Sequence, residues 1–255
     1  MNLRFCSAAL LALAAAGLLQ AETYREPFSE IRPLSPSGTV ELQNTNGSIT
    51  IRTWNRNEVQ IAGEKEASDR DDLQDLQVEI EATPDAIVIR GKKVHRNWMS
   101  ILGWSHSEAI RFNLMVPAGA HLASVHTVNG PIDIAGTTGP VRVDSVNGPV
   151  QASGLRGGAR ISTVNGAVHA AFASVGARDQ LSFSTVNGAI TVMLPRSAAV
   201  QARTSTINGH VTCDFPYTSG RHSDREAPAA SPAAVAVSAR TVNGAISLRA
   251  VPDKT

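Results

Sequence analysis

The sequence predicts an all-β fold, a right-handed parallel β-solenoid in which successive turns of chain stack along one axis. Three observations support this prediction. A phrase of the form Ser/Thr-Val/Ile-Asn-Gly recurs along the chain, apolar residues alternate with polar ones around each copy, and aromatic residues make up only 4% of 255 residues. The Asn-Gly pairs follow each other at steps of 18, 18, 22, 21 and 35 residues between Asn129 and Asn243.

Alternating apolar side chains lie on both sides of every Asn-Gly pair. Around Asn165, Ile161 lies four residues upstream, and Val168 and Ala170 lie two and four residues beyond Gly166. A period of two is typical of strands that bury one face. Each repeat therefore predicts a strand, a Val-Asn-Gly corner, a second strand and a second turn.

Two topologies fit these repeats: an antiparallel meander of hairpins and a parallel solenoid. Two positions favour the solenoid. The residue before each Asn from Asn129 to Asn243 is Val or Ile, which a hairpin would leave in solvent and which we expect the corner to bury between coils. The residue after Gly is proline at Pro131 and Pro149, where a two-residue hairpin needs an N–H donor. The right hand is the one that parallel crossovers favour.

The repeated corner is expected to be a signature of the fold and not a catalytic motif. Asn tolerates the left-handed backbone that such corners need, Gly adopts it freely, and stacked Asn amides can hydrogen-bond along the column. The predicted structural corners are Asn46, Gly47, Asn129, Gly130, Asn147, Gly148, Asn165, Gly166, Asn187, Gly188, Asn208, Gly209, Asn243 and Gly244.

The N-terminal residues have the order of a secretory signal peptide. Arg4 precedes an uncharged run from Ala8 to Leu19, and residues 1–21 are expected to be removed after Ala21. That run is too short to cross a bilayer comfortably, and nothing later resembles a transmembrane segment. The mature chain is therefore expected to be exported, to the periplasm or the cell surface.

The mature chain is expected to hold one solenoid domain. The predicted divisions are a lead-in or cap at 22–37, the solenoid at 38–250, and a tail at 251–255. Within the solenoid, 38–122 are diverged rungs, 123–250 are regular Asn-Gly rungs, and 214–234 are an inserted loop. The segment "SDRDDLQDL" fits either a short helical turn or a solvated loop.

Charge restricts the partners that the chain can have. Removal of residues 1–21 leaves 22 basic and 22 acidic residues, a balance that argues against nucleic acid as the main partner. One outward column is basic, with Arg142, Arg160 and Arg203 interrupted by Ser182. Such a stripe suits an acidic glycan or a phosphate-bearing polymer, although exposed arginines also serve solubility and the protection of sheet edges.

No catalytic residue, cofactor site or metal site is predicted. The outward positions carry no paired carboxylates, and the histidines lack the spacing of metal ligands. Cys213 occupies an inward column, which indicates a buried, inert thiol. The favoured function is a nonenzymatic structural or binding module. A polysaccharide-active enzyme and a regulatory module that binds another envelope protein remain alternatives.

One apolar cluster does not belong to the repeats. It follows Lys92 and Lys93 and has two possible roles, covering the open end of the solenoid or contacting a partner or the membrane surface. The residues of the cluster are Trp98, Met99, Ile101, Leu102 and Trp104.

The order of several motifs resembles a known family. The Asn-Gly segments, "NGSITIRTWNRNEVQIAGEKEA", "DLQVEIEATPDAIVIRGKK" and "FNLMVPAGAHL" together are similar to the bacterial cell-envelope proteins called "putative adhesins", a domain family of unknown function. The likeness covers most of residues 38–250. It implies a β-solenoid in the envelope, partnered by an envelope protein or glycan, and it carries over no catalytic residue.

Overall fold

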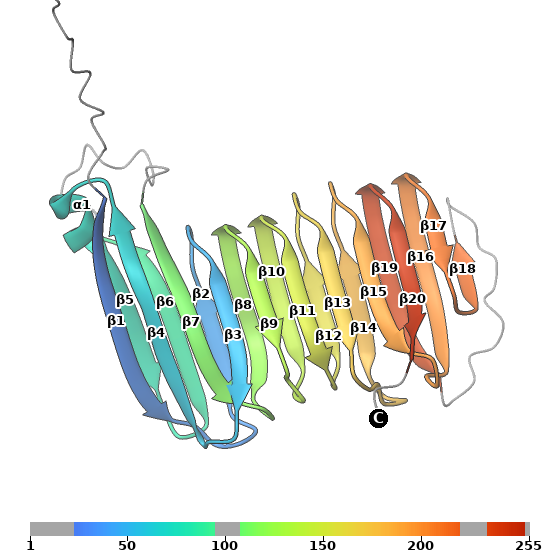
Figure 1. The fold of residues 1–255 in the computed structure, drawn as a ribbon, viewed down its shortest axis with the longest axis horizontal. Helices are drawn as coiled ribbons and strands as arrows, with labels where there is room; N and C mark the ends of the chain where they lie inside the picture. The colour runs from blue at the N-terminus through green and yellow to red at the C-terminus, as the bar shows by residue number, and fades with distance from the viewer. Residues whose placement is uncertain (1–22, 95–107, 220–233, 253–255) are drawn as a thin grey trace, which may run out of the picture.

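The structure, a computed structural model, describes residues 23–94, 108–219 and 234–252. Within these ranges the chain forms twenty strands, in two ten-stranded sheets, and one short helix (Figure 1). The predicted signal peptide, the cluster Trp98, Met99, Ile101, Leu102 and Trp104, and most of the predicted loop at 214–234 lie outside the described residues.

The two sheets, called sheet A and sheet B here, face each other along the whole solenoid. In spatial order, sheet A consists of β1 (Tyr24–Pro33), β4 (Glu58–Ala67), β7 (Ala109–Pro117), β3 (Ile49–Trp54), β9 (Ile132–Ala135), β11 (Val150–Leu155), β13 (Val168–Phe172), β15 (Ile190–Pro195), β20 (Ile246–Val251) and β17 (Val211–Cys213). Sheet B consists of β5 (Leu76–Ala82), β6 (Ala86–Lys93), β2 (Thr39–Gln43), β8 (His121–Asn129), β10 (Val141–Asn147), β12 (Ala159–Ser162), β14 (Gln180–Ser184), β19 (Val235–Asn243), β16 (Val200–Asn208) and β18 (Tyr217–Ser219).

Parallel pairing in register confirms the all-β, mostly parallel prediction. In sheet A, Val150, Val168 and Ile190 stand opposite one another on β11, β13 and β15. In sheet B, Val143 on β10 faces Ile161 on β12. Each coil adds one strand to each sheet, and the inward residues are fully buried. The core is therefore a continuous apolar column between the sheets, and the right-handed sense of the superhelix stays a prediction.

The N-terminal end departs from parallel pairing. Strands β1, β4 and β7 pair antiparallel in sheet A, as do β5 and β6 in sheet B. The segment "SDRDDLQDL", predicted as a short helical turn or a loop, forms the helix α1 (Arg70–Asp75). Asp69 caps this helix, because its side chain accepts a hydrogen bond from the backbone N–H of Asp72 at 2.7 Å. The outermost strand β1 is mostly exposed and alternates charges, an arrangement that discourages edge-to-edge pairing.

Coils at both ends are inserted between coils that are not their neighbours in sequence. Strands β19 and β20 lie between β14/β15 and β16/β17, and strands β2 and β3 lie between β6/β7 and β8/β9 (Figure 1). The coil formed by 200–213 therefore comes earlier in the sequence than β19/β20 but lies further along the solenoid axis. This order accounts for the 35-residue step between Asn208 and Asn243.

Glycine is needed at the corner mainly because adjacent coils approach too closely for a side chain. A Cβ atom placed on Gly166 would lie 2.2 Å from the carbonyl oxygen of Gly148. The sequence argument from left-handed backbone holds for fewer positions, since among the corner glycines φ is clearly positive at Gly47, Gly130 and Gly244 only. The carbonyl of one coil thus occupies the space that a Cβ of the next would need.

The expectation that the corner valine is buried between coils is wrong. Val164 and Val186 are 41% and 40% exposed, and Ile207 is 57% exposed. The buried residue is the preceding one: Thr163 is 4% exposed and donates a hydrogen bond from its hydroxyl to the carbonyl of Gly148 at 3.2 Å. Because side chains alternate along a strand, an inward threonine directs the following valine outward.

The backbone hydrogen bonds explain why proline can follow the corner glycine. At the place of Pro131 and Pro149, the equivalent Ala167 donates no backbone–backbone hydrogen bond among the described residues. The carbonyls of both prolines accept bonds, from the N–H groups of Ile49 and Ile132. The corner therefore accommodates proline without losing a donor.

Replacing Gly166 by alanine should lower the free energy of unfolding by about 2–3 kcal/mol, because the added methyl group meets a backbone carbonyl that cannot rotate away. Gly158→Ala is the control, since a Cβ there meets its nearest atom at 3.5 Å, an ordinary contact. Urea unfolding followed by circular dichroism measures both. Equal stability of the two variants would contradict the close-approach explanation.

Adjacent substitutions at the corner should have unequal effects. Thr163→Asp places an unpaired charge in the core and should cost about 3 kcal/mol or more. Val164→Asp changes an outward side chain and should cost less than about 1 kcal/mol. Thermal unfolding of the two variants checks the orientation of the corner, and a larger loss at position 164 would reverse it.

Candidate binding surface

Unpaired arginines distinguish the outer face of sheet B from that of sheet A. On sheet A, Arg52 pairs with Asp133, and Arg249 lies 3.8 Å from a carboxylate oxygen of Asp214. On sheet B, by contrast, three exposed arginines form no ion pair within the part of the chain that the structure describes. They are Arg160, Arg203 and Arg240.

The positions of the basic column predicted from the sequence stand opposite one another on neighbouring strands, but two serines, and not one, interrupt the arginines. Arg142 on β10 stands opposite Arg160 on β12, which stands opposite Ser182 on β14. Beyond β14 the inserted strand β19 contributes Ser238, and Arg203 on β16 follows. The column thus runs along the solenoid axis at about 4.8 Å per strand.

A hollow of about 390 Å³ opens beside this column where the strands of sheet B begin. Arg142 and Arg160 line one part of it, and Arg178 lines it from the turn that precedes β14. Gly158 also lines the hollow and leaves space because it has no side chain. We call this feature the arginine hollow and define it by Arg142, Arg160, Arg178 and Gly158.

Nearby carboxylates neutralise the arginine hollow only in part. Arg142 lies 3.2 Å from Asp144, whose other oxygen accepts a hydrogen bond from Ser162. Asp179 accepts a hydrogen bond from the backbone N–H of Gly176 at 2.7 Å, within its own turn. Among the described residues, Arg160 and Arg178 therefore keep their charge without a partner, so the hollow presents a positive potential.

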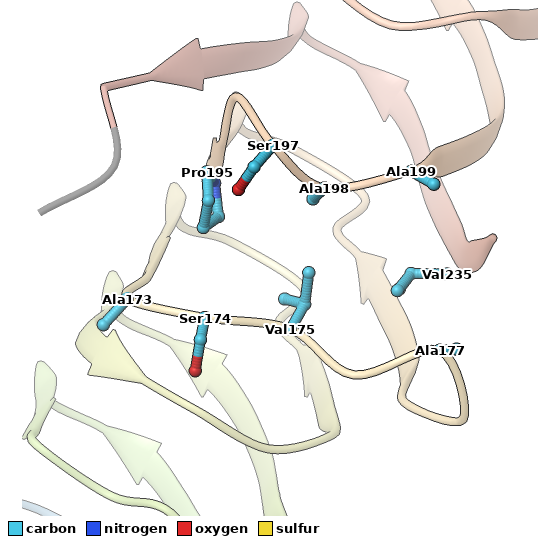
Figure 2. Close-up of a pocket in the computed structure, with 9 residues that line it drawn as sticks. All are labelled: Ala173, Ser174, Val175, Ala177, Pro195, Ser197, Ala198, Ala199 and Val235. Atoms are coloured by element: carbon cyan, nitrogen blue, oxygen red, sulfur yellow. The ribbon is translucent and has the colours of Figure 1, made fainter. Parts of the chain in front are cut away.

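A second hollow, of about 360 Å³, lies at the opposite edge from the Asn-Gly corners (Figure 2). Figure 2 shows two turns around it, one carrying Ala173 and Val175 and the other carrying Pro195 and Ala198, with Val235 beside them. Strand β19 begins at this edge, and its first residue, Val235, lines the hollow together with the two turns.

The described residues that line this hollow, and an adjoining one, carry no charged side chain. An adjoining apolar hollow of about 440 Å³ shares Ala173 and Pro195 and is completed by Phe172, Met193 and Val251, among others. Among the described residues, no acidic, basic or histidine side chain lines either hollow. Apart from the hydroxyl groups of Ser174 and Ser197, these spaces offer apolar packing surface.

The predicted corner asparagines are joined by their own side chains. Every Asn of the row except Asn46, at its end, donates from Nδ2 to Oδ1 of the Asn in a neighbouring coil, as Asn165 does to Asn147 at 2.8 Å. The row of seven follows spatial order, not sequence order, because Asn187 is linked to Asn243 and Asn243 to Asn208. The amides are thus used within the fold, and they leave little for a ligand.

The structure also brings together a buried ion pair that sequence reasoning missed. Lys93 at the end of β6 lies 2.6 Å from Glu108, and their side chains are 5% and 1% exposed. Burial raises the pKa of Glu108, while burial of Lys93 is outweighed by its bonds to Glu108 and Asp72, so the pKa of Lys93 is also raised. The pair connects the end of β6 in sheet B with the residue that precedes β7 in sheet A.

Cys213 lies in the inward column of sheet A, as its place in the repeat predicted. It stands opposite Leu248 in sheet A and packs against the core, although it is only partly buried. Burial raises the pKa of its thiol, which donates a hydrogen bond to the carbonyl of Phe215 at 3.3 Å. This environment disfavours the reactive thiolate.

Metal-binding and membrane-spanning features were sought in the described ranges, 23–94, 108–219 and 234–252. They contain no group of three His, Cys, Asp or Glu side chains placed to hold a metal ion. No helix within them has the length and apolar character needed to cross a bilayer. The arginine hollow is accordingly the charged feature with the clearest capacity to bind.

The family model called Toastrack DUF4097 matches residues 36–249. The chain belongs to this family, whose function is unknown, and the resemblance drawn from the sequence is confirmed. No curated protein matches the sequence at a significant level.

Several solved structures are similar in fold. A protein described as a "putative cell adhesion protein" from Clostridium sporogenes shares 14% identity with a TM-score of 0.51, over 89% of this chain and 100% of its own. A "putative adhesin" from Bacteroides fragilis shares 11% identity with a TM-score of 0.43, over 88% and 97%. A "putative lipid binding protein" from Parabacteroides distasonis shares 12% identity with a TM-score of 0.35, over 88% and 96%. At these identities the likeness of the first shows the fold alone, and the other two carry no argument.

Removing one partner of the buried pair should be costly. Lys93→Met leaves Glu108 buried without its counter-charge and should lower the free energy of unfolding by about 3–5 kcal/mol. Lys92→Met is the matched control, because its pair with Glu79 is exposed and should contribute less than about 1 kcal/mol. Adding Glu108→Leu to Lys93→Met should restore much of the loss. Equal effects at positions 92 and 93 would refute the burial argument.

Proposed function

We propose that this protein is a nonenzymatic, exported binding module of the bacterial cell envelope, and that the outer face of sheet B receives its partner. The proposal includes a right-handed solenoid whose Val-Asn-Gly corners act as scaffold. The observation that carries it is the presence on sheet B of three exposed arginines, Arg160, Arg203 and Arg240, that form no ion pair among the described residues, most of whose other charges are paired. Unpaired cations held on a rigid sheet keep a positive potential that an anionic partner can neutralise.

The sequence supports the proposed location. The order of residues 1–21 is that of a secretory signal peptide, and the Toastrack family model covers the chain that follows from residue 36. The description of the Clostridium sporogenes protein as a cell adhesion protein supports a binding role for a shared fold. The apolar cluster Trp98–Trp104 remains a candidate second contact, with a partner protein or a membrane surface.

An envelope polysaccharide-active enzyme is the second candidate, because Asp179 lines the same hollow as Arg142, Arg160 and Arg178. In such an enzyme the carboxyl group of Asp179 would transfer a proton, and the arginines would bind the negative charge of an acidic sugar. The hydrogen bond from Gly176 to Asp179 favours a structural role for this carboxylate, since it holds the turn together.

Sedimentation with isolated envelope fragments tests the proposed function. The mature chain, residues 22–255, should pellet with the fragments and release no reducing sugar from them, because a binding module holds its partner without cleaving it. A chain that stays in the supernatant would contradict the proposal. Release of sugar by the wild type and not by Asp179→Asn would establish the enzyme instead.

A further inference from the structure

We infer that the arginine hollow binds the oxyanion groups, carboxylate or phosphate, of a linear acidic glycan that lies along sheet B. The inference rests on the proposed function and adds the chemical class of the partner. It follows from the charge, the geometry and the direction of the residues around the hollow.

The charge distribution calls for an anion from outside the chain. Arg142 and Arg160 are direct neighbours on adjacent parallel strands, and like charges in that relation repel each other. Asp144 pairs with Arg142 only. Arg178 adds a third guanidinium from the turn before β14. Asp179 also lines the hollow but forms no ion pair with Arg160 or Arg178, so an oxyanion there would pair with these guanidinium groups and relieve the repulsion.

The geometry suits a carboxylate or a phosphate. A guanidinium presents a planar fork of N–H donors that matches two oxygens of one anion. Arg142 and Arg160 approach from the sheet and Arg178 from the turn, so an anion would be contacted from two sides. The missing side chain at Gly158 leaves the space for it.

The direction of the column suits a linear polymer. Beyond Arg160 the same column presents Ser182, Ser238 and then Arg203, one residue from each neighbouring strand. The donors therefore run parallel to the solenoid axis, over roughly 19 Å from Arg142 to Arg203. Guanidinium groups at both ends and hydroxyl groups between them can hydrogen-bond to acidic and neutral positions of one extended sugar chain.

Two other anionic partners fit the column less well. A membrane surface generally requires apolar anchors among the basic residues, and this column offers serine and arginine. Single-stranded nucleic acid generally stacks its bases on aromatic rings, and the column has none. An acidic glycan needs only the donors that are present.

Binding to immobilised polygalacturonate and polyphosphate, measured by biolayer interferometry at 50 and 300 mM salt, tests the inference. Dextran is the neutral control, and phosphatidylglycerol vesicles and single-stranded DNA represent the other partners. We expect the mature chain to bind polygalacturonate, polyphosphate or both, but not dextran, and to bind more weakly at 300 mM salt. The preferred polymer identifies carboxylate or phosphate as the natural group.

Two double variants locate the binding. Arg160→Gln with Arg178→Gln should weaken binding roughly tenfold or more, because two charge-assisted contacts are lost. Arg52→Gln with Arg249→Gln removes the same charge from sheet A and should change it less than about twofold. Melting temperatures confirm that both variants are folded, and Ser182→Asp, which sets an acid at the hollow, should weaken binding as well.

Three outcomes would overturn the inference: no binding to either acidic polymer, tighter binding to vesicles or DNA than to both polymers, or equal losses in the two double variants. A wild type that pellets with envelope fragments but fails these tests would leave the proposed function standing with a different partner.

Discussion

In-register stacking at the Asn-Gly corner is the constraint on which the structure depends. The N–H of Gly166 bonds to the carbonyl of Asn187 in the next coil, and the side-chain amide of Asn187 bonds back to that of Asn165. Because an asparagine amide carries both a donor and an acceptor, identical asparagines in successive coils can each donate to one neighbour and accept from the other. The repetition of the motif therefore supports the stacking, and a single substitution would break two hydrogen bonds of the row.

The same constraint explains why the ends of the chain can be inserted. A coil that carries the corner can pair with any other coil on either side, so β19/β20 fits between β14/β15 and β16/β17. The asparagine row continues through the insertion without interruption. The inserted strand β19 also contributes Val235 to the hollow of Figure 2 at the opposite edge, so the order of the coils affects the surface there.

The repeat period and the alternation of side chains were enough to predict the parallel strands, the inward columns and the place of Cys213. They were not enough to predict the spatial order of the coils, because the corner motif is the same in every copy. Only the 35-residue step before Asn243 departs clearly from the regular spacing. The outward direction of Val164 was missed because alternation was not followed through the corner. The bulge in β8, which shifts its register against β10, breaks the alternation of side chains there and leaves Leu122 buried.

The site was predictable where it follows the repeat and not elsewhere. Arg142, Arg160 and Arg203 share one repeat position, so they formed a visible column. Arg178 lies in a turn between repeats, and Lys93 and Glu108 lie 15 residues apart outside the regular rungs, so only the fold brings them to their partners. Stacking constrains the corner and the inward residues but not the outward ones, and on sheet B this chain carries arginines at outward positions.

Disulfide trapping tests the coil order most directly. In a Cys213→Ala background, Ser182→Cys with Ser238→Cys places two thiols on paired positions of β14 and β19, where Cα atoms in adjacent strands lie about 5 Å apart. Ser182→Cys with Arg203→Cys tests the alternative in which coils stack in sequence order. The structure predicts that mild oxidation crosslinks the first pair and not the second. Crosslinking of the second pair alone would show that β14 and β16 are neighbours and would contradict the inserted position of the last coil.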